Sequence, residues 1–283
     1  RIIYTQQTPY QNLVLTKNQD DLRLYINRII QFSSLDEYRY HESLASIPLT
    51  AAPYKKNVLI LGGGEGLLAR EVLKYSAVER ITIVDLDGEV FRLGIENPQL
   101  AELNAHALTH PKVRTVTDDA LNFLKNTNQR FDVILADLPD PSSESIARMY
   151  STTFYKLVRS RLSRYGVFTT QATSPYHTRR AFWSIVETLK VSGFTDVQAF
   201  HTYVPSFGEW GFVLAAEWKV EPTDFEPTVP LKYLEPRTVE QAFYFAKDMS
   251  NPGGLEPNYL DQPVLLDYFL EDWARWRKEK EGN

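Results

Sequence analysis

The stretch that decides the fold runs from Val58 to Gly66 and reads VLILGGGEG. Its four apolar residues predict a buried strand, and residues 67–73 carry apolar side chains at the spacing of a helix. A glycine-rich turn between a strand and a helix is typical of the first unit of an open, mostly parallel α/β sheet, where a ligand binds at the turn. The stretch therefore predicts a Rossmann-like domain.

Strand-like apolar runs alternate with helix-like segments over residues 57–216. This alternation is typical of βαβ units, so we expect an α/β fold with a largely parallel sheet. The last two strands are expected to form an antiparallel pair at one edge. The predicted strands are residues 58–61, 81–84, 113–116, 133–136, 167–170, 197–200 and 212–216.

The chain divides into three predicted regions. Residues 1–50 contain short alternating runs around the polar cluster 17–21, which predicts a hairpin, and we expect a β-rich domain with a linking helix. Residues 51–217 form the predicted Rossmann-like domain, which would carry the site. Residues 218–283 are expected to form a C-terminal helical extension. Its two helices are predicted at 239–247 and 263–278.

The composition excludes several kinds of site. The 283 residues include no cysteine, which removes disulfides, zinc-thiolate sites, iron–sulfur clusters and thiol nucleophiles. A formal net charge of −5 gives no bulk attraction for nucleic acid and fits cationic small molecules better. No run approaches the roughly 18 apolar residues that a membrane-spanning helix needs. His106, His110 and His177 lack metal-ligand spacing, and we expect no metal.

The glycine loop favours a cationic ligand. Its spacing is not the dinucleotide pattern G-x-G-x-x-G, because Leu67 stands three residues after Gly64. Glu65 places a carboxylate at the start of the helix, where it would repel a pyrophosphate. NAD, FAD and ATP are therefore disfavoured, although a glycine turn by itself is also compatible with a purely structural role.

Acidic residues follow the next two strands. Asp85 and Asp87 stand after the second strand, where Rossmann-like proteins place the acid that binds ribose hydroxyls. Asp118 and Asp119 follow the third strand, where a carboxylate can accept a hydrogen bond from an exocyclic amine. These acids predict a pocket for adenosine without phosphate, as in an S-adenosyl ligand with its positive sulfonium.

A pair of carboxylates ends the fourth strand. Asp137 and Asp140 flank Leu138 and Pro139 in the sequence ADLPDP. One acid of such a pair can accept a proton while the other binds a distant positive charge. The alternative is a turn with a helix-capping acid, which is common for Asp beside Pro.

Further motifs join these acids in a fixed order. The run 31–42 reads QFSSLDEYRYHE, and Tyr10-Gln11, VDLD at 84–87, Asp119-Ala120, VPSF at 204–207 and Gly211-Phe212 accompany it. Over residues 8 to 216 the chain resembles the polyamine aminopropyltransferases, the spermidine and spermine synthase family. The resemblance implies a small N-terminal β-domain on a Rossmann-like sheet of the S-adenosylmethionine methyltransferase type.

The resemblance also implies a reaction. Decarboxylated S-adenosylmethionine would be the co-substrate that donates an aminopropyl group, with no tightly bound cofactor, and putrescine would be the acceptor, giving spermidine and methylthioadenosine. Glu65 stands where most family members carry Asp, and Phe207 stands where Tyr is frequent, both as in thermospermine synthases. Spermidine, giving thermospermine or spermine, is therefore the alternative acceptor.

Residue roles follow from matching the family motifs. On the donor side these are Gln11 and Gln31 at the nucleoside, Gly62 and Gly64 in the loop, Glu65 at the ammonium, Asp85 at the ribose, and Asp119 with Ala120 at the adenine. The implied catalytic residues are Asp137 as proton acceptor and Tyr40, which aligns the attacking nitrogen. His41, Asp140 and Phe207 are implied on the acceptor side. Trp210, beside Glu209 in the same region, is a further candidate for lining the amine channel, although Trp side chains more often serve packing.

Two rival functions share parts of this pattern. An S-adenosylmethionine methyltransferase has the same fold but would not be expected to carry Glu65 with Asp137 and Asp140. A non-catalytic polyamine-binding protein would keep the acids without turnover. A dehydrogenase is disfavoured by the glycine spacing.

The resemblance extends to assembly and location. It implies a homodimer formed partly through the N-terminal β-domain, with polyamines as small-molecule partners and no nucleic acid. Residues 258–265, NYLDQPVL, are similar to the C-terminal part of bacterial relatives in which a membrane domain precedes the synthase domain. Because the chain starts at Arg1, we expect a cytoplasmic part of such a protein, at the membrane face if that domain is present.

Overall fold

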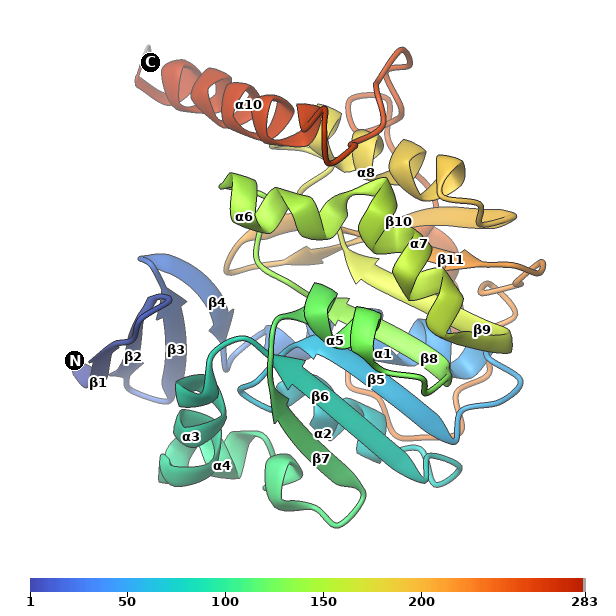
Figure 1. Cartoon of the computed structure of the whole chain (residues 1–283). Helices are drawn as coiled ribbons and strands as arrows, with labels where there is room; N and C mark the ends of the chain where they lie inside the picture. Colours follow the sequence, from blue (N-terminus) through green and yellow to red (C-terminus); the bar gives the residue numbers. More distant parts are fainter. Residues whose placement is uncertain (282–283) are drawn as a thin grey trace.

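Residues 1–281 form two β-sheets with helices packed around the larger one (Figure 1). This computed structural model describes residues 1–281 and the side chains of residues 1–276. The small sheet is antiparallel, in the order β1-β2-β3-β4. Its strands are β1 (Ile2–Gln7), β2 (Asn12–Asn18), β3 (Asp21–Ile26) and β4 (Ile29–Ser33).

The small sheet packs its inner face onto the larger domain. Alternation along β2 and β3 places Leu15 and Leu24 on one side, where they are buried together with Phe32. These side chains contact Leu67 and Leu93, which come from the helices beside the glycine loop. The predicted hairpin forms at residues 17–21, where Asn18 pairs with Asp21. The contacts with Leu67 and Leu93 hold the small sheet beside the glycine loop.

Within the described residues the large sheet has seven strands, in the order β10-β11-β9-β8-β5-β6-β7. The five strands from β9 to β7 are parallel to one another. Strand β11 pairs antiparallel with β9 and with β10, which confirms the predicted antiparallel pair at one edge. The chain runs outward from β5 through β6 to β7 and returns on the other side of β5, so a topological switch point lies between β5 and β8. The strands are β5 (Asn57–Gly62), β6 (Arg80–Asp85), β7 (Val113–Thr117), β8 (Phe131–Asp137), β9 (Leu162–Gln171), β10 (Asp196–Val204) and β11 (Gly208–Ala216).

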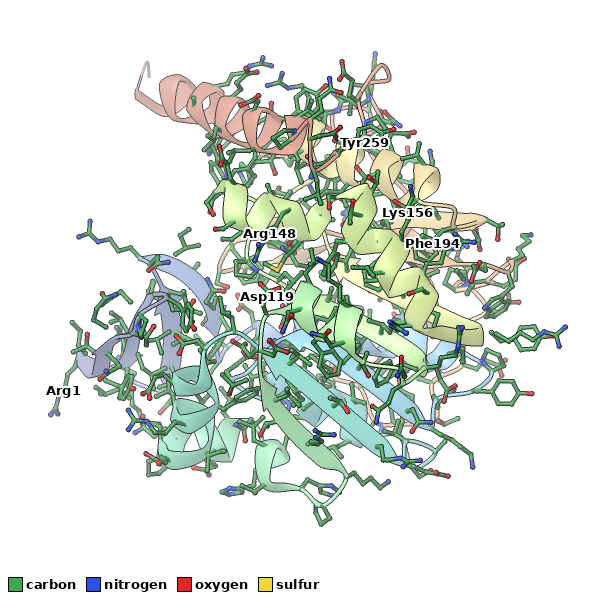
Figure 2. The ribbon with its side chains drawn as sticks, viewed as in Figure 1. Arg1, Asp119, Arg148, Lys156, Phe194 and Tyr259 are labelled. Atoms are coloured by element: carbon green, nitrogen blue, oxygen red, sulfur yellow. The ribbon has the colours of Figure 1, made fainter. Side chains whose placement is uncertain are left out.

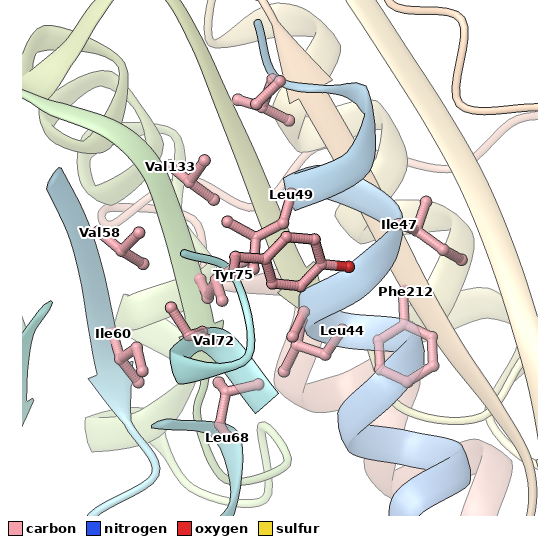
Figure 3. Packing of buried hydrophobic residues seen from close by; sticks show 14 of the residues in the cluster. Leu44, Ile47, Leu49, Val58, Ile60, Leu68, Val72, Tyr75, Val133 and Phe212 are labelled. Carbon is pink, nitrogen blue, oxygen red and sulfur yellow. The ribbon is translucent and has the colours of Figure 1, made fainter. Parts of the chain in front are cut away.

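Both faces of the large sheet are covered. Successive side chains of β5 point to opposite faces, so Val58 and Ile60 join one core and Leu59 and Leu61 the other. Figure 3 shows the first core, in which side chains of helix α1 (Glu37–Ala51) pack together with residues of α2, β5 and β8. The helices are α1 (Glu37–Ala51), α2 (Leu67–Leu73), α3 (Gly88–Glu96), α4 (Pro98–Leu103), α5 (Ala120–Asn126), α6 (Glu144–Ala147), α7 (Thr152–Arg161), α8 (Arg179–Val191), α9 (Pro236–Ala242) and α10 (Val264–Glu281), with 3₁₀ turns η1 (Ala107–Thr109) and η2 (Arg148–Tyr150).

The C-terminal region differs in part from its prediction. The final helix is present as α10, but the helix predicted at 239–247 begins at Pro236 and ends at Ala242. Proline is favoured in the first helical turn, which explains the earlier start. The chain then leaves the helix, and the rings of Phe243 and Phe245 pack against Phe200 and His201. Among the described residues no helix combines the length and the apolar character needed to cross a membrane.

One buried carboxylate joins the C-terminal region to α1. Glu42 is fully buried and accepts hydrogen bonds from the backbone N–H groups of Lys232, Tyr233 and Leu234, at 2.6, 2.9 and 3.2 Å. Three donors satisfy a charge that burial would otherwise make costly. Because α1 also packs on the large sheet, this contact holds residues 232–234 to the main core.

We expect Glu42→Ala to lower the free energy of unfolding by about 3 kcal/mol or more, because it leaves three backbone N–H groups buried without an acceptor. Chemical denaturation measures the change. The control is Glu240→Ala on the surface of α9, which should alter stability by less than about 0.5 kcal/mol. An equal effect of both variants would contradict the assigned role of Glu42.

Candidate active site

A cavity of about 550 Å³ opens where the carboxyl ends of β5, β6 and β8 meet the small sheet. Among the described residues its wall contains six carboxylates and a single guanidinium, that of Arg148. Such a wall attracts cations and repels phosphates. The carboxylates belong to Glu65, Asp85, Asp87, Asp119, Asp137 and Asp140.

The glycine loop is pressed between two of these acids. Gly62 has a φ of +83°, and a Cβ at this position would lie 2.1 Å from the carbonyl oxygen of Asp137. A Cβ on Gly64 would lie 2.7 Å from Oδ2 of Asp85, and the N–H of Gly64 donates a hydrogen bond to that oxygen at 3.1 Å. Only glycine fits either position. Gly62 lines the cavity, whereas Gly64 lies behind it and holds Asp85.

Glu65 lines the cavity, and one of its two carboxylate oxygens has no hydrogen-bond partner among the described residues. Its side chain is 12% exposed, and its Oε1 atom has no hydrogen-bond donor among the described residues. Burial, followed by the negative charge of Asp137, raises the pKa of Glu65 to about 7. A ligand ammonium beside Oε1 would supply the missing positive charge.

Asp137 and Tyr40 form a hydrogen-bonded pair. The Tyr40 hydroxyl donates to Oδ1 of Asp137 at 2.5 Å. Burial raises the pKa of Asp137, and burial with the adjacent carboxylate raises the pKa of Tyr40 well above its usual range. The phenol therefore stays neutral and donates, and Asp137 is a stronger base than an exposed aspartate.

Asp140 is a second acid with an unpaired oxygen. Its Oδ1 atom is buried and lacks a hydrogen-bond partner in the described part of the chain. Burial raises the pKa of Asp140 to about 7, against the hydrogen bonds of Thr173 and Gln171. The backbone before Asp140 is fixed, because Gln171 and Tyr150 donate hydrogen bonds to the carbonyl groups of Leu138 and Pro139.

Gln171 and Tyr150 are residues that the sequence analysis missed. For Gln171 the sequence did contain a signal, because this polar residue follows the fifth predicted strand, which lies next to the strand that carries Asp137. Gln171 also accepts hydrogen bonds from the indole N–H of Trp210, at 3.2 Å, and from the backbone of Thr173, at 2.9 Å. Its oxygen and nitrogen are thus both engaged in holding the cavity wall.

The two aromatic residues predicted for the acceptor side lie together in the cavity wall. Phe207 and Trp210 line the cavity, with ring centroids 4.9 Å apart and an edge-to-face arrangement. Phe207 also contacts the ring of Tyr40 at 6.0 Å. Because the indole N–H of Trp210 is bound to Gln171, the face of the ring is the part that can contact an ammonium group.

His41 lies at the base of the cavity. It is 2% exposed, and its Nε2 atom is 3.8 Å from Oε1 of Glu65. A ring nitrogen of His41 and one carboxylate oxygen each of Glu65 and Asp137 all lie within 4.8 Å of one another. Two carboxyl groups so close together make this part of the wall attractive to a positively charged group.

The predicted nucleoside side contains Asp85, Gln11 and Gln31, which all line the cavity. Asp85 accepts the backbone N–H of Asp87 at 3.0 Å, and burial raises its pKa to about 6. Gln11 donates to Asp87 at 3.0 Å, and Thr8 donates to the same oxygen at 2.7 Å. Asp87 therefore ties the small sheet to the large domain, a role that the sequence analysis did not assign.

Asp119 and Ala120 line the far end of the cavity. Asp119 caps α5 by accepting the N–H of Asn122, and its other oxygen accepts a hydrogen bond from Arg148 at 2.6 Å. Figure 2 shows Arg148 and Asp119 facing each other between η2 and α5. The predicted adenine contact of Asp119 would thus be made beside an existing ion pair.

The fold and the site define a Rossmann-like protein with an acidic cavity at the switch point of its sheet. A family model described as "Spermine/spermidine synthase domain" matches residues 37–227. The chain belongs to this family. It is 45% identical over 276 residues to polyamine aminopropyltransferase 2 of Ralstonia nicotianae, with 96% of this chain and 53% of the relative covered.

Two further comparisons agree. The polyamine aminopropyltransferase of Leptospira interrogans is 42% identical, with 97% of this chain and 54% of the relative covered. The chain thus spans about half the length of the curated relatives it matches. A crystal structure of spermidine synthase in complex with the transition-state analogue AdoDATO has a TM-score of 0.81 at 25% identity, covering 87% of this chain and 86% of the other.

We expect Glu65→Gln to stabilise the free protein at pH 8. The folded-state pKa of Glu65 is about 7, against an ordinary value of 4.5, so the ionised carboxylate penalises the folded state once the pH exceeds 4.5, and the penalty is largest above pH 7. The neutral amide removes a penalty of roughly 3 kcal/mol at pH 8. The gain should shrink as the pH falls and vanish below 4.5, where the carboxyl is protonated in both states.

Chemical denaturation at pH 8 and at pH 5 measures this difference. Asp132→Asn is the control, because Asp132 accepts hydrogen bonds from the backbone of Asn57 and from Ser163 and should gain nothing at either pH. A Glu65→Gln variant that is no more stable than the original at pH 8 would show that the carboxylate is not an unpaired charge.

Proposed function

We propose that the chain transfers the aminopropyl group of decarboxylated S-adenosylmethionine to an amine. The observation that carries the proposal is a cavity in which Glu65 and Asp140 each hold an oxygen without a hydrogen-bond partner among the described residues, with Asp137 on its wall. Membership of the spermine/spermidine synthase family and the likeness to a spermidine synthase bound to AdoDATO support it.

Electrostatics explains why such a reaction needs this cavity. The donor carries a sulfonium and an ammonium group, and the acceptor carries further ammonium groups, so the two substrates repel each other. Carboxylates in a partly dry site offset this repulsion more strongly than water does. Glu65 would bind the donor ammonium, and Asp140 would bind the far end of the acceptor.

The chemical step is a direct displacement. Asp137 accepts a proton from the acceptor ammonium, while Tyr40 keeps the carboxylate aligned. The free nitrogen lone pair then attacks the propyl carbon next to sulfur, so that a C–N bond forms and the C–S bond breaks. The bonding electrons return to sulfur, which leaves as the neutral thioether methylthioadenosine. Holding the reactants in line supplies most of the rate.

Glu65 would also select the donor. Ordinary S-adenosylmethionine carries a carboxylate that decarboxylated S-adenosylmethionine lacks, and this group would come near the Glu65 side chain. Repulsion between two carboxylates in a buried site disfavours the wrong donor. This argues against methyl transfer as the function of the same cavity.

We propose putrescine as the acceptor and keep spermidine as the alternative. Putrescine needs only Asp137 at one end and Asp140 at the other, and both are present. Spermidine is favoured by Glu65 and Phe207, the two residues shared with thermospermine synthases. A homodimer, a preceding membrane domain and a cytoplasmic location stay predictions of the family resemblance.

The first test follows methylthioadenosine. The protein is incubated with decarboxylated or ordinary S-adenosylmethionine and with putrescine or spermidine. We expect methylthioadenosine only with the decarboxylated donor, and the faster acceptor identifies the product. Absence of methylthioadenosine with every amine, or transfer of a methyl group, would overturn the proposal.

The second test concerns the proton acceptor. We expect Asp137→Asn to lower kcat by at least about a hundredfold, the range of general base catalysis, while calorimetry still detects donor binding. The control Asp132→Asn alters an aspartate at the opposite end of β8 and should leave kcat nearly unchanged. Unchanged turnover in Asp137→Asn would mean that another group accepts the proton.

A further inference from the structure

A buried ion pair lies behind the cavity, between α1 and α2. The Glu37 side chain is 3% exposed, and Arg70 binds both of its oxygens, with Nη1 2.8 Å from Oε1 and Nη2 2.9 Å from Oε2. Arg70 is itself held by the carbonyl oxygen of Leu103 at 2.9 Å and by Glu71. Neither Glu37 nor Arg70 belongs to the cavity wall formed by the described residues.

His41 connects this ion pair to the cavity. Its Nδ1 atom lies 2.7 Å from Oε2 of Glu37 and 2.9 Å from the carbonyl oxygen of Glu37. Both oxygens only accept hydrogen bonds, so Nδ1 carries the hydrogen and donates. The other ring nitrogen, Nε2, therefore faces Glu65, and the orientation of the imidazole is set from behind.

The groups that face the His41 ring come from three elements. Glu37 and Tyr40 lie on α1, Glu65 lies in the loop between β5 and α2, and Asp137 ends β8. Three of these four groups are carboxyl groups. A charged imidazole at this place would sit between one acid that does not touch the cavity and two acids that line it.

We propose that Glu37 is a positioning residue for the transfer reaction: it holds His41 with Nε2 towards Glu65 and Asp137. A positive imidazole at this place favours the ionised form of both carboxyl groups until the cationic substrates supply the positive charge instead. The inference rests on the proposed function, because it describes how the same cavity is prepared for its substrates. It gives the Glu37–Arg70 pair a role beyond packing.

The charges agree with this arrangement. His41 and Arg70 hold the pKa of Glu37 at about 2 despite its burial, so this carboxylate is ionised at any working pH. Burial lowers the pKa of His41, but Glu37, Asp137 and Glu65 together raise it above its ordinary value. In return, His41 lowers the pKa of Glu65 and of Asp137, which burial raises.

The first experiment reads His41 directly. The chain has five histidines, so ring nitrogen-15 NMR can assign His41 by comparison with His41→Gln. We expect a ring with Nδ1 protonated throughout and a pKa above the ordinary value, and in Glu37→Gln a pKa below it, because burial stays and the charge is lost. An unchanged pKa in Glu37→Gln would overturn the inference, whether or not the protein transfers aminopropyl groups.

The second experiment is a double-mutant cycle on the reaction. We expect Glu37→Gln to lower kcat/KM for the amine about tenfold at pH 7 and to move the acidic limb of the pH profile upward by about one pH unit, because the pKa values of Glu65 and Asp137 rise. His41→Gln should act alike. In the double variant the two losses should not add, since Glu37 acts through His41.

The control is Glu42→Gln, the same change on the same helix at an equally buried site that does not contact His41. It should lower the melting temperature but leave the pH profile in place. Its effect on kcat/KM should be the same whether residue 41 is His or Gln. Additive losses for Glu37→Gln and His41→Gln, or a pH profile that does not move, would show that Glu37 serves stability alone.

Discussion

A carboxylate that is taken out of water without a partner destabilises a fold, and this protein keeps several at one place. Glu65 and Asp140 each leave an oxygen without a hydrogen bond in the described residues, and burial raises both pKa values to about 7. The arrangement makes sense for a cavity that must hold positive charge, since a bound cation removes the penalty. The same carboxylates lower the stability of the protein as long as no cation is bound to them.

The sheet, the glycine loop and helix α1 together bring these carboxylates to one cavity. The carboxyl ends of parallel strands converge, and the glycine loop allows Asp85 and Asp137 to approach the same backbone within a distance that no side chain would permit. Helix α1 supplies the rest: Tyr40 bonds Asp137, and the same helix is held from outside through Glu37 and Glu42. Because α1 is fixed on both sides, the side chains between these anchors have little freedom.

The comparisons and the geometry limit the function from different directions. The family model matches residues 37–227, and about half of the relative's length lies outside the matched part. The proposed reaction is therefore argued from the residues of this chain's own cavity. The cavity favours a donor and an acceptor that are both cationic. Asp140 lines the same cavity as the paired rings of Phe207 and Trp210.

The sequence by itself determined the sheet, the position of the site and most of the acids around it. Glycines after β5 and acids after β6, β7 and β8 are local signals, and parallel strands bring their ends together by geometry. Only the tertiary structure decided which groups are paired: that Asp119 is bound to Arg148, that Gln171 and Tyr150 fix the loop before Asp140, and that Glu37 holds His41. These contacts join residues from separate elements, and their strength depends on burial. Neither can be calculated from spacing along the chain, because a side chain's partners and its exposure to water are properties of the packed fold.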